Sequence, residues 1–184
     1  MDDEKHAGHK MTLRKTAAAP TVVLAMHGAP PLDFPKNALA VFFTLHARVG
    51  HGGAGPENQR RRYEELEAKV RGWPRTGDND PFYAGSVELA EYLRRALGLE
   101  VILGFNEFCS PSLAEALDRA ARSAPKILVI TPMMTRGGEH SAVDIPEAIR
   151  AAQEKHPGKE FVYVWPFPTQ DIARFLCNEI ARFL

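Results

Sequence analysis

The sequence predicts an α/β fold of three layers, in which helices cover both faces of a four-stranded parallel sheet. Four short apolar runs rich in β-branched and aromatic residues alternate with amphipathic helical patterns. Strands that alternate with helices in this way form right-handed crossovers and a parallel sheet. The chain of 184 residues is also long enough to bury a sizeable core in one domain. A long helical insert is expected between the first two strands.

The charge balance argues against a nucleic-acid partner. The chain has 23 Lys and Arg residues and 23 Asp and Glu residues, so it lacks the positive excess that binds phosphate backbones. Residues 1–18 are polar and charged, and we expect a disordered tail there, followed by a single domain over residues 19–184. No apolar run has the length of a signal-peptide core or a membrane span, so no membrane partner is expected.

The two cysteines, Cys109 and Cys177, lie far apart and without C-x-x-C spacing. Neither a disulfide framework nor a thiolate zinc site is therefore predicted. A reducing cytoplasm is the setting that this cysteine usage favours.

The first strand is predicted at residues 21–26 and ends at His27, Gly28, Ala29, Pro30 and Pro31. A phosphate-binding turn needs a series of backbone N–H groups. The two prolines remove two of these donors, and only one glycine is present. The turn therefore favours a presented imidazole over a phosphate cradle.

The insert over residues 36–98 shows three helical patterns and no strand. We expect the second helix to begin at Pro56 and the first and third to end at Gly50 and Gly98. His46 and His51 are interpreted as surface or core residues without a functional role. The apolar positions of the three helices are Leu39, Phe42, Phe43 and Leu45, then Tyr63, Leu66, Val70 and Trp73, then Leu89, Leu93 and Leu97.

The second strand is predicted at residues 101–105, and Ser110 is expected to cap the next helix with Pro111 in its first turn. The third strand, at residues 127–130, ends before Thr131 and Pro132, and two later glycines free the backbone. We therefore expect His140 to lie in a loop beyond this strand.

A further helix is predicted to open at Pro146 and to end near His156, a surface residue favoured by the helix dipole. The fourth strand is expected at residues 161–165. Thr169 is then expected to cap a last amphipathic helix. Its apolar side carries Ile172, Phe175, Leu176, Ile180 and Phe183.

Three side chains that can bind metal follow the first three predicted strands. His27, Glu107 and His140 should all lie at the carboxyl edge of the sheet, where parallel strands end together. If the strand order is 2-1-3-4, the two histidines flank the switch point. Two imidazoles and one carboxylate suit Fe, Co, Ni and Zn in an open site, and the same groups can accept protons. The competing interpretation is an interaction domain in which all three residues are structural.

Two segments carry a resemblance to a known family. G-F-N-E-F-C-S-P-S-L-A-E-A-L, at residues 104–117, and P-M-M-T-R-G-G-E-H-S-A-V-D-I-P, at residues 132–146, resemble the CbiX-type sirohydrochlorin chelatases, a group of class II chelatases. His27-Gly28 and the H-P-G at His156 fit the same pattern, which covers most of residues 20–168. The resemblance implies a chelatase-like fold built like half of a flavodoxin-like protein.

The resemblance also implies an activity. Such an enzyme inserts a divalent metal, Co²⁺ or Fe²⁺, into a tetrapyrrole such as sirohydrochlorin without ATP, in cobalamin or sirohaem biosynthesis. Ni²⁺ and Zn²⁺ are further candidate metals; the metal is a substrate, and no permanently bound cofactor is expected. The alternative is a non-catalytic metal or tetrapyrrole carrier of the same fold.

Residue roles follow from the same resemblance. His27, His140 and Glu107 match the residues that bind the metal and act in catalysis. A homodimer is implied as the working form. The residues expected to contact the substrate are Gly28, Ala29, Pro30, Arg136 and Gly138.

Overall fold

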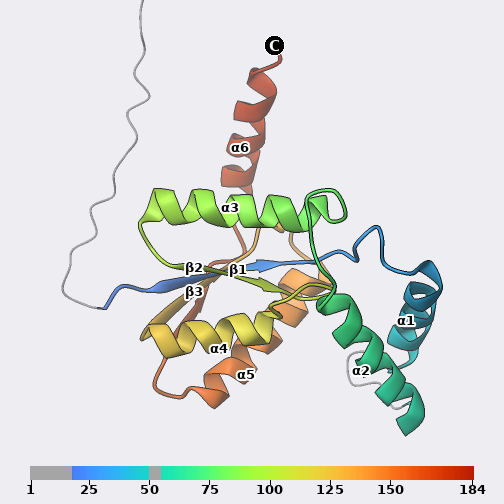
Figure 1. The fold of residues 1–184 in the computed structure, drawn as a ribbon. Coiled ribbons are helices and arrows are strands. Elements are labelled where there is room, and N and C mark those ends of the chain that lie inside the picture. The colour runs from blue at the N-terminus through green and yellow to red at the C-terminus, as the bar shows by residue number, and fades with distance from the viewer. Residues whose placement is uncertain (1–17, 50–54) are drawn as a thin grey trace, which may run out of the picture.

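A computed structural model describes residues 18–49 and 55–184. Its centre is a sheet of four parallel strands in the order β2-β1-β3-β4. Figure 1 shows this sheet between layers of helices. The predicted fold class is therefore confirmed, and the strand order is the one that puts the switch point between β1 and β3. The tail predicted over residues 1–18, except residue 18 itself, lies outside the described residues, as do Gly50 and His51. The strands are β1 (Thr21–Met26), β2 (Val101–Phe105), β3 (Lys126–Ile130) and β4 (Glu160–Tyr163).

Helices lie on both faces of the sheet. Helix α3 (Pro81–Leu97) runs across one face, and α4 (Leu113–Ser123) and α5 (Ile145–Lys155) cover the other (Figure 1). Alternate residues of β1 point to the two faces: Val22 and Leu24 belong to the core on the α3 side, and Val23 and Ala25 to the core under α4 and α5. As predicted, α3 ends at Gly98, whose φ of 65° is the left-handed conformation that glycine adopts freely.

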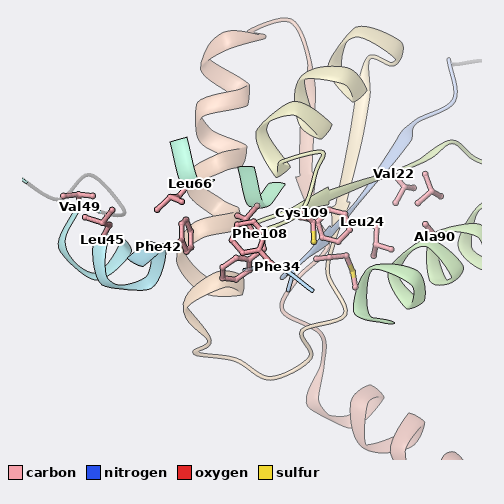
Figure 2. Packing of buried hydrophobic residues seen from close by; sticks show 14 residues of the cluster. Val22, Leu24, Phe34, Phe42, Leu45, Val49, Leu66, Ala90, Phe108 and Cys109 are labelled. Carbon is pink, nitrogen blue, oxygen red and sulfur yellow. The ribbon is translucent and has the colours of Figure 1, made fainter. Parts of the chain in front are cut away.

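The rest of the insert extends the core beyond the sheet. Helices α1 (Lys36–Val49) and α2 (Glu57–Arg71) pack against each other beside the carboxyl edge of the sheet. Figure 2 shows buried apolar side chains that continue from Leu24 in the sheet through Phe108 to Phe42 on α1. The three helices expected in the insert are confirmed. Trp73 was expected on the second helix but lies beyond its end, where its Nε1 donates to Asp33.

The start of α4 differs from the prediction. The capping residue is Ser112, not Ser110, and the helix begins at Leu113. Glu115 stands three residues after Ser112 and completes a capping box with it, which Ser110 has no partner to form. Hydrogen bonds from the backbone and hydroxyl of Ser112 lower the pKa of Glu115.

The prediction of a loop around His140 is also wrong. His140–Asp144 form a short π-helical segment that leads directly into α5. Gly137, with a φ of 86°, ends the preceding turn, so that helical backbone begins soon after it. Tyr163 on β4 donates a hydrogen bond of 2.9 Å to the Ser141 carbonyl and ties this segment to the sheet. A π-helical turn inside a helix often marks a functional site.

The C-terminal part differs in three details. Strand β4 ends at Tyr163, two residues earlier than predicted, and the Thr169 side chain makes no capping hydrogen bond because Pro168 is the N-cap residue of α6 (Thr169–Ala181). His156 does end α5, but it is partly buried and its Nε2 lies 2.7 Å from Asp118 Oδ1. Helix α6 has no buried residue and points away from the sheet in Figure 1. Within residues 18–49 and 55–184, no helix combines the length and hydropathy needed to cross a membrane.

Candidate metal centre

The structure brings His27, Glu107 and His140 together at the carboxyl edge of the sheet. One ligand atom from each lies within 4.8 Å of the others. Both imidazoles face the same carboxylate oxygen: Glu107 Oε2 is 3.6 Å from His27 Nδ1 and 3.9 Å from His140 Nε2. The juxtaposition expected from the sequence is confirmed, and the metal-binding and catalytic roles of these residues stay predictions. We call these three side chains the metal cluster.

The metal cluster is open on one side. The His27 side chain is 45% exposed, whereas those of Glu107 and His140 are 19% and 21% exposed. Two nitrogens and one carboxylate group form a donor set for borderline divalent cations, and three protein ligands leave coordination positions free for a substrate. The arrangement is therefore that of a site that can receive and release an ion, not of a closed structural site.

His140 is oriented by a second carboxylate. Asp144, one turn later, places Oδ2 2.5 Å from His140 Nδ1. A proton on Nδ1 donates to this carboxylate and leaves the Nε2 lone pair directed toward Glu107. Such carboxylate partners fix the tautomer of metal-binding histidines. Asp144 was not predicted as a site residue, although its i+4 spacing from His140 on helical backbone was a usable signal.

Backbone hydrogen bonds join the loops that carry His27 and Glu107. The Glu107 N–H donates to the His27 carbonyl at 2.9 Å, and the Asn106 N–H donates to the Met26 carbonyl at 2.9 Å. Gly28 follows with a φ of 102°, a conformation that is essentially restricted to glycine. The structure gives Gly28 a backbone role in the close approach of the two loops, and its predicted contact with the substrate stays a prediction.

A buried arginine of the insert forms hydrogen bonds to both the loop that carries His27 and the loop that carries Glu107. The Arg75 guanidinium donates to the Ala29 carbonyl at 2.7 Å and to the Phe108 carbonyl at 2.5 Å. Its side chain is 6% exposed and is paired with the buried carboxylate of Asp80. Ala29, another predicted substrate contact, is therefore held through its carbonyl by the insert.

A second arginine reinforces the loop after β2. Arg71 donates to the Asn106 carbonyl at 2.9 Å and to the Cys109 carbonyl at 2.8 Å. Cys109 itself is fully buried, and burial raises the pKa of its thiol. A protonated, enclosed thiol packs as a small apolar group and is not a metal ligand.

His46 was interpreted as a residue without a function, but it lies beside the metal cluster. Its Nε2 is 3.7 Å from Glu107 Oε1, whereas the other two histidines lie near Oε2, and its Nδ1 is 3.2 Å from the Tyr63 hydroxyl. Burial raises the pKa of Tyr63 to about 12, so this hydroxyl stays protonated at neutral pH. A cavity of about 310 Å³ lies here, lined by Phe42, His46, Tyr63, Glu67, Asn106, Glu107 and Phe108.

The other predicted substrate contacts lie in two different settings. Pro30 is partly buried in the turn after β1. Arg136 is exposed and has no charged partner among the described residues, so its guanidinium is available to an anion. Gly138 is exposed, and its carbonyl accepts a hydrogen bond of 3.2 Å from the Ser141 hydroxyl at the start of the π-helical segment. Substrate contact at these residues stays a prediction.

Several curated proteins are similar in sequence. A sirohydrochlorin cobaltochelatase from Methanopyrus kandleri is 33% identical over 75 residues, which cover 40% of this chain and 52% of that protein. The sirohydrochlorin cobaltochelatase from Priestia megaterium is 33% identical over 69 residues, 38% of this chain and 22% of that protein. One from Saccharolobus islandicus is 36% identical over 63 residues, 34% of this chain and 48% of that protein. The matches thus span about half of the length of these relatives, or less.

Two solved structures are also similar. A CbiX protein of cobalamin biosynthesis from Marinobacter aquaeolei VT8 has a TM-score of 0.48 and 16% identity, and the match covers 90% of this chain and all of that one. The sirohydrochlorin chelatase SirB from Bacillus subtilis subspecies spizizenii, in complex with cobalt, has a TM-score of 0.39 and 14% identity, with 80% and 43% of the two chains covered.

The family model described as CbiX matches residues 77–182. The matched region includes Glu107, His140 and Asp144, whereas His27 and His46 precede it. It covers more than half of the 184 residues. The chain therefore belongs to the CbiX family.

Proposed function

We propose that the protein inserts a divalent metal, Co²⁺ or Fe²⁺, into a tetrapyrrole such as sirohydrochlorin without ATP, in cobalamin or sirohaem biosynthesis. The observation that carries this proposal is the open metal cluster, in which two imidazoles face one carboxylate oxygen at 3.6 Å and 3.9 Å. Membership of the CbiX family and the names of the curated relatives support the same reaction.

The chemistry of metal insertion fits this donor set. An aqueous ion must lose water before it reaches the four nitrogens of a macrocycle, and protein ligands can replace that water in steps. His27, Glu107 and His140 would hold the ion on one face of the macrocycle. Two pyrrole N–H protons must leave as the ion enters, and imidazole and carboxylate groups at this position can accept them.

The substrate would lie over the turn after β1 and the loop before His140. In this proposal Gly28, Ala29 and Pro30 form the floor beside His27, and Gly138 lies at the opposite side. Arg136 would pair with a carboxylate of the macrocycle, because it is an exposed guanidinium without a charged partner in the described part of the chain.

We further propose that residues 19–184 form one chelatase-like domain, with the insert at 36–98, and that two copies form a homodimer. The metal cluster lies on an open edge of the sheet. The cavity beside it has a volume of only about 310 Å³, at the lower end of the range for small-molecule sites, and a flat macrocycle needs more enclosure. A second copy could supply the missing wall.

A metal-by-tetrapyrrole matrix tests the activity. The protein is mixed under anaerobic conditions with Co²⁺, Fe²⁺, Ni²⁺ or Zn²⁺ and with sirohydrochlorin or another porphyrinoid, and the visible spectrum is followed. We expect metal insertion to be faster than in a protein-free control, and His27→Ala and His140→Ala to lower this rate by about 10²-fold or more. His156→Ala, a histidine change away from the metal cluster, should keep the rate. A carrier would shift the spectrum on binding without accelerating insertion, and that outcome contradicts the enzymatic proposal.

A further inference from the structure

Helix α6 has an apolar side that nothing in the described structure covers. Phe175, Leu176 and Ile180 are 48%, 49% and 58% exposed, and Phe183, just after the helix, is 89% exposed. Figure 1 shows α6 pointing away from the rest of the fold, and no described element packs along it. A helix of 13 residues is marginally stable alone in water, so α6 needs a partner surface to persist as a helix.

The sheet has a matching uncovered surface on the α3 side. Leu128 and Ile130 of β3, with Val162 of β4 beside Leu128, point to this side and are only partly buried. Val164, which follows β4, is 39% exposed. We call these four residues the open strip.

The two faces of the same strands differ sharply in burial. On the opposite face, Ile127 and Val129 are 0% exposed beneath α4 and α5. On the α3 side, α3 packs on β2 at the other end of the sheet and does not reach the open strip. Parallel sheets are normally covered by helices on both faces. The open strip therefore has no helix packed on it, and the apolar side of α6 has no sheet to pack against.

We propose that α6 of one copy packs on the open strip of a second copy, and that the exchange is reciprocal. A twofold arrangement of this kind satisfies both uncovered surfaces at once and closes on itself. Within one chain, the segment between β4 and α6 contains Pro166 and Pro168, which restrict the backbone and direct α6 away from its own sheet. The inference rests on the homodimer proposed above and does not depend on metal insertion.

The area available is sufficient for a stable dimer. Four large apolar side chains of α6 and its end expose about half of their surface or more, and aromatic side chains bury roughly 150–250 Å² each when covered. Counting both copies of the helix and the strips beneath them, the exchange buries on the order of 1,500 Å², within the range of specific interfaces. No net charge opposes the association, since the chain has equal numbers of acidic and basic residues.

Site-specific cross-linking separates exchange from other arrangements. The full chain is used with Cys177→Ser, while the buried Cys109 is kept. Leu176→Cys is introduced into one copy, and Val162→Cys into a second copy that carries a mass tag. The two copies are co-expressed and treated with a short bifunctional cross-linker that reacts with two thiols. We expect a cross-linked species that contains one copy of each variant, and little product from either variant alone.

The outcomes that would overturn the inference are distinct. If both cysteines are placed on one chain and the linker joins them at the mass of a single chain, α6 folds onto its own sheet and the exchange is refuted. A particle of twice the chain mass in light scattering, with no cross-link between the two variants, leaves the homodimer intact but refutes exchange. A single-chain mass at all concentrations refutes the homodimer as well, whatever the result of the metal-insertion assay.

A charge placed on the apolar side of α6 provides a second test. Ile180→Glu should convert the dimer to a species of single-chain mass, because a carboxylate cannot be buried against the open strip. Asn178→Glu adds the same charge on the opposite side of α6 and should leave the dimer unchanged. Circular dichroism of both variants reports whether the sheet domain stays folded. Dimerisation that survives Ile180→Glu contradicts the proposal.

Discussion

Gly28 and Glu107 approach each other so closely that a Cβ atom at residue 28 would lie 1.9 Å from the Glu107 carbonyl oxygen. The φ of 102° at Gly28 is also strained for any residue with a side chain. We expect Gly28→Ala to lower the free energy of unfolding by about 1–3 kcal/mol or more and to displace Glu107 from His27 and His140. Urea unfolding measures the first effect, and calorimetric Co²⁺ binding measures the second.

Gly77→Ala is the matched control for this substitution. Gly77 lies in a turn of the insert, and a Cβ atom there would have no heavy atom within 4 Å. Its backbone is not in the left-handed region, so the variant should be as stable as the natural chain and bind Co²⁺ equally well. Equal losses in the two glycine variants would show that the close approach at Gly28 is not the cause.

Asp144→Asn should weaken metal binding without unfolding the protein. The asparagine keeps the size of the side chain but removes the charge that holds the Nδ1 proton of His140 at 2.5 Å. Loss of such an orienting carboxylate typically lowers metal affinity about 10–100-fold. Titration calorimetry with Co²⁺ checks this value, and Glu154→Gln, an exposed change on α5, serves as the control. Unchanged affinity would mean that Asp144 does not orient His140 for metal binding.

Arg75→Ala should be among the most destabilising single changes in the chain. It removes four hydrogen bonds and leaves Asp80, 2% exposed, as a buried charge without its partner. Breaking a buried ion pair on one side costs about 3–5 kcal/mol. Arg75→Lys should rescue only part of this, because an ammonium group cannot reproduce the planar fork. Denaturant unfolding of both variants tests the expected order of stability, in which the natural chain is the most stable, Arg75→Lys is intermediate and Arg75→Ala is the least stable. A lysine variant as stable as the natural chain would contradict it.

His46→Ala tests whether the insert takes part in the metal site. The His46 Nε2 lies 3.7 Å from Glu107 Oε1, whereas His27 and His140 lie near the other oxygen, Oε2. We expect Co²⁺ affinity to fall roughly tenfold, less than after His27→Ala or His140→Ala, as for other outer-shell groups. His156→Ala should leave the affinity unchanged. A loss as large as that expected for His27→Ala or His140→Ala would instead make His46 a ligand itself.

Tyr163 should make stability sensitive to alkaline pH. Burial raises its pKa to about 12, above the value of 10.0 for an unperturbed tyrosine. The neutral form is thus favoured in the folded state. The resulting contribution to the free energy of unfolding is complete below pH 10 and is lost as the pH rises from 10 toward 12. Tyr163→Phe also loses the hydrogen bond to Ser141, worth about 1 kcal/mol at neutral pH.

The measurement compares Tyr163→Phe with the natural chain by urea unfolding at pH 8 and at several values above 10. The natural chain should be the more stable at pH 8, and the difference in unfolding free energy should shrink as the pH rises. The other tyrosines affect both proteins equally and cancel in this difference. A difference that is constant with pH would contradict the raised pKa of Tyr163.

The sheet and the metal cluster could be predicted because both follow from local pattern and one topological rule. The runs at residues 21–26 and 101–105 match β1 and β2 in full, since fully buried parallel strands are continuously apolar. His27 and Glu107 come directly after these strands, so a parallel sheet brings them to one edge whatever their separation in the sequence.

The features that the sequence did not reveal depend on long-range packing or on competing local signals. His46 reaches Glu107 only because α1 is folded back onto the carboxyl edge of the sheet, and a helical pattern does not specify that placement. Ser110 and Ser112 are both acceptable caps by residue type, and only the reciprocal contact with Glu115 selects the second. The amphipathic pattern of α6 correctly predicts a helix but says nothing about which surface receives it.

Arg71 and Arg75 have a consequence for protein engineering. Both guanidinium groups belong to the insert, yet they donate hydrogen bonds to carbonyl groups of the two loops that carry His27 and Glu107. A chimaera that receives these loops alone would leave their carbonyls without donors. A transplant of these loops onto another sheet must therefore include the segment from α2 to Asp80, because that segment supplies the hydrogen-bond donors for the loop carbonyls.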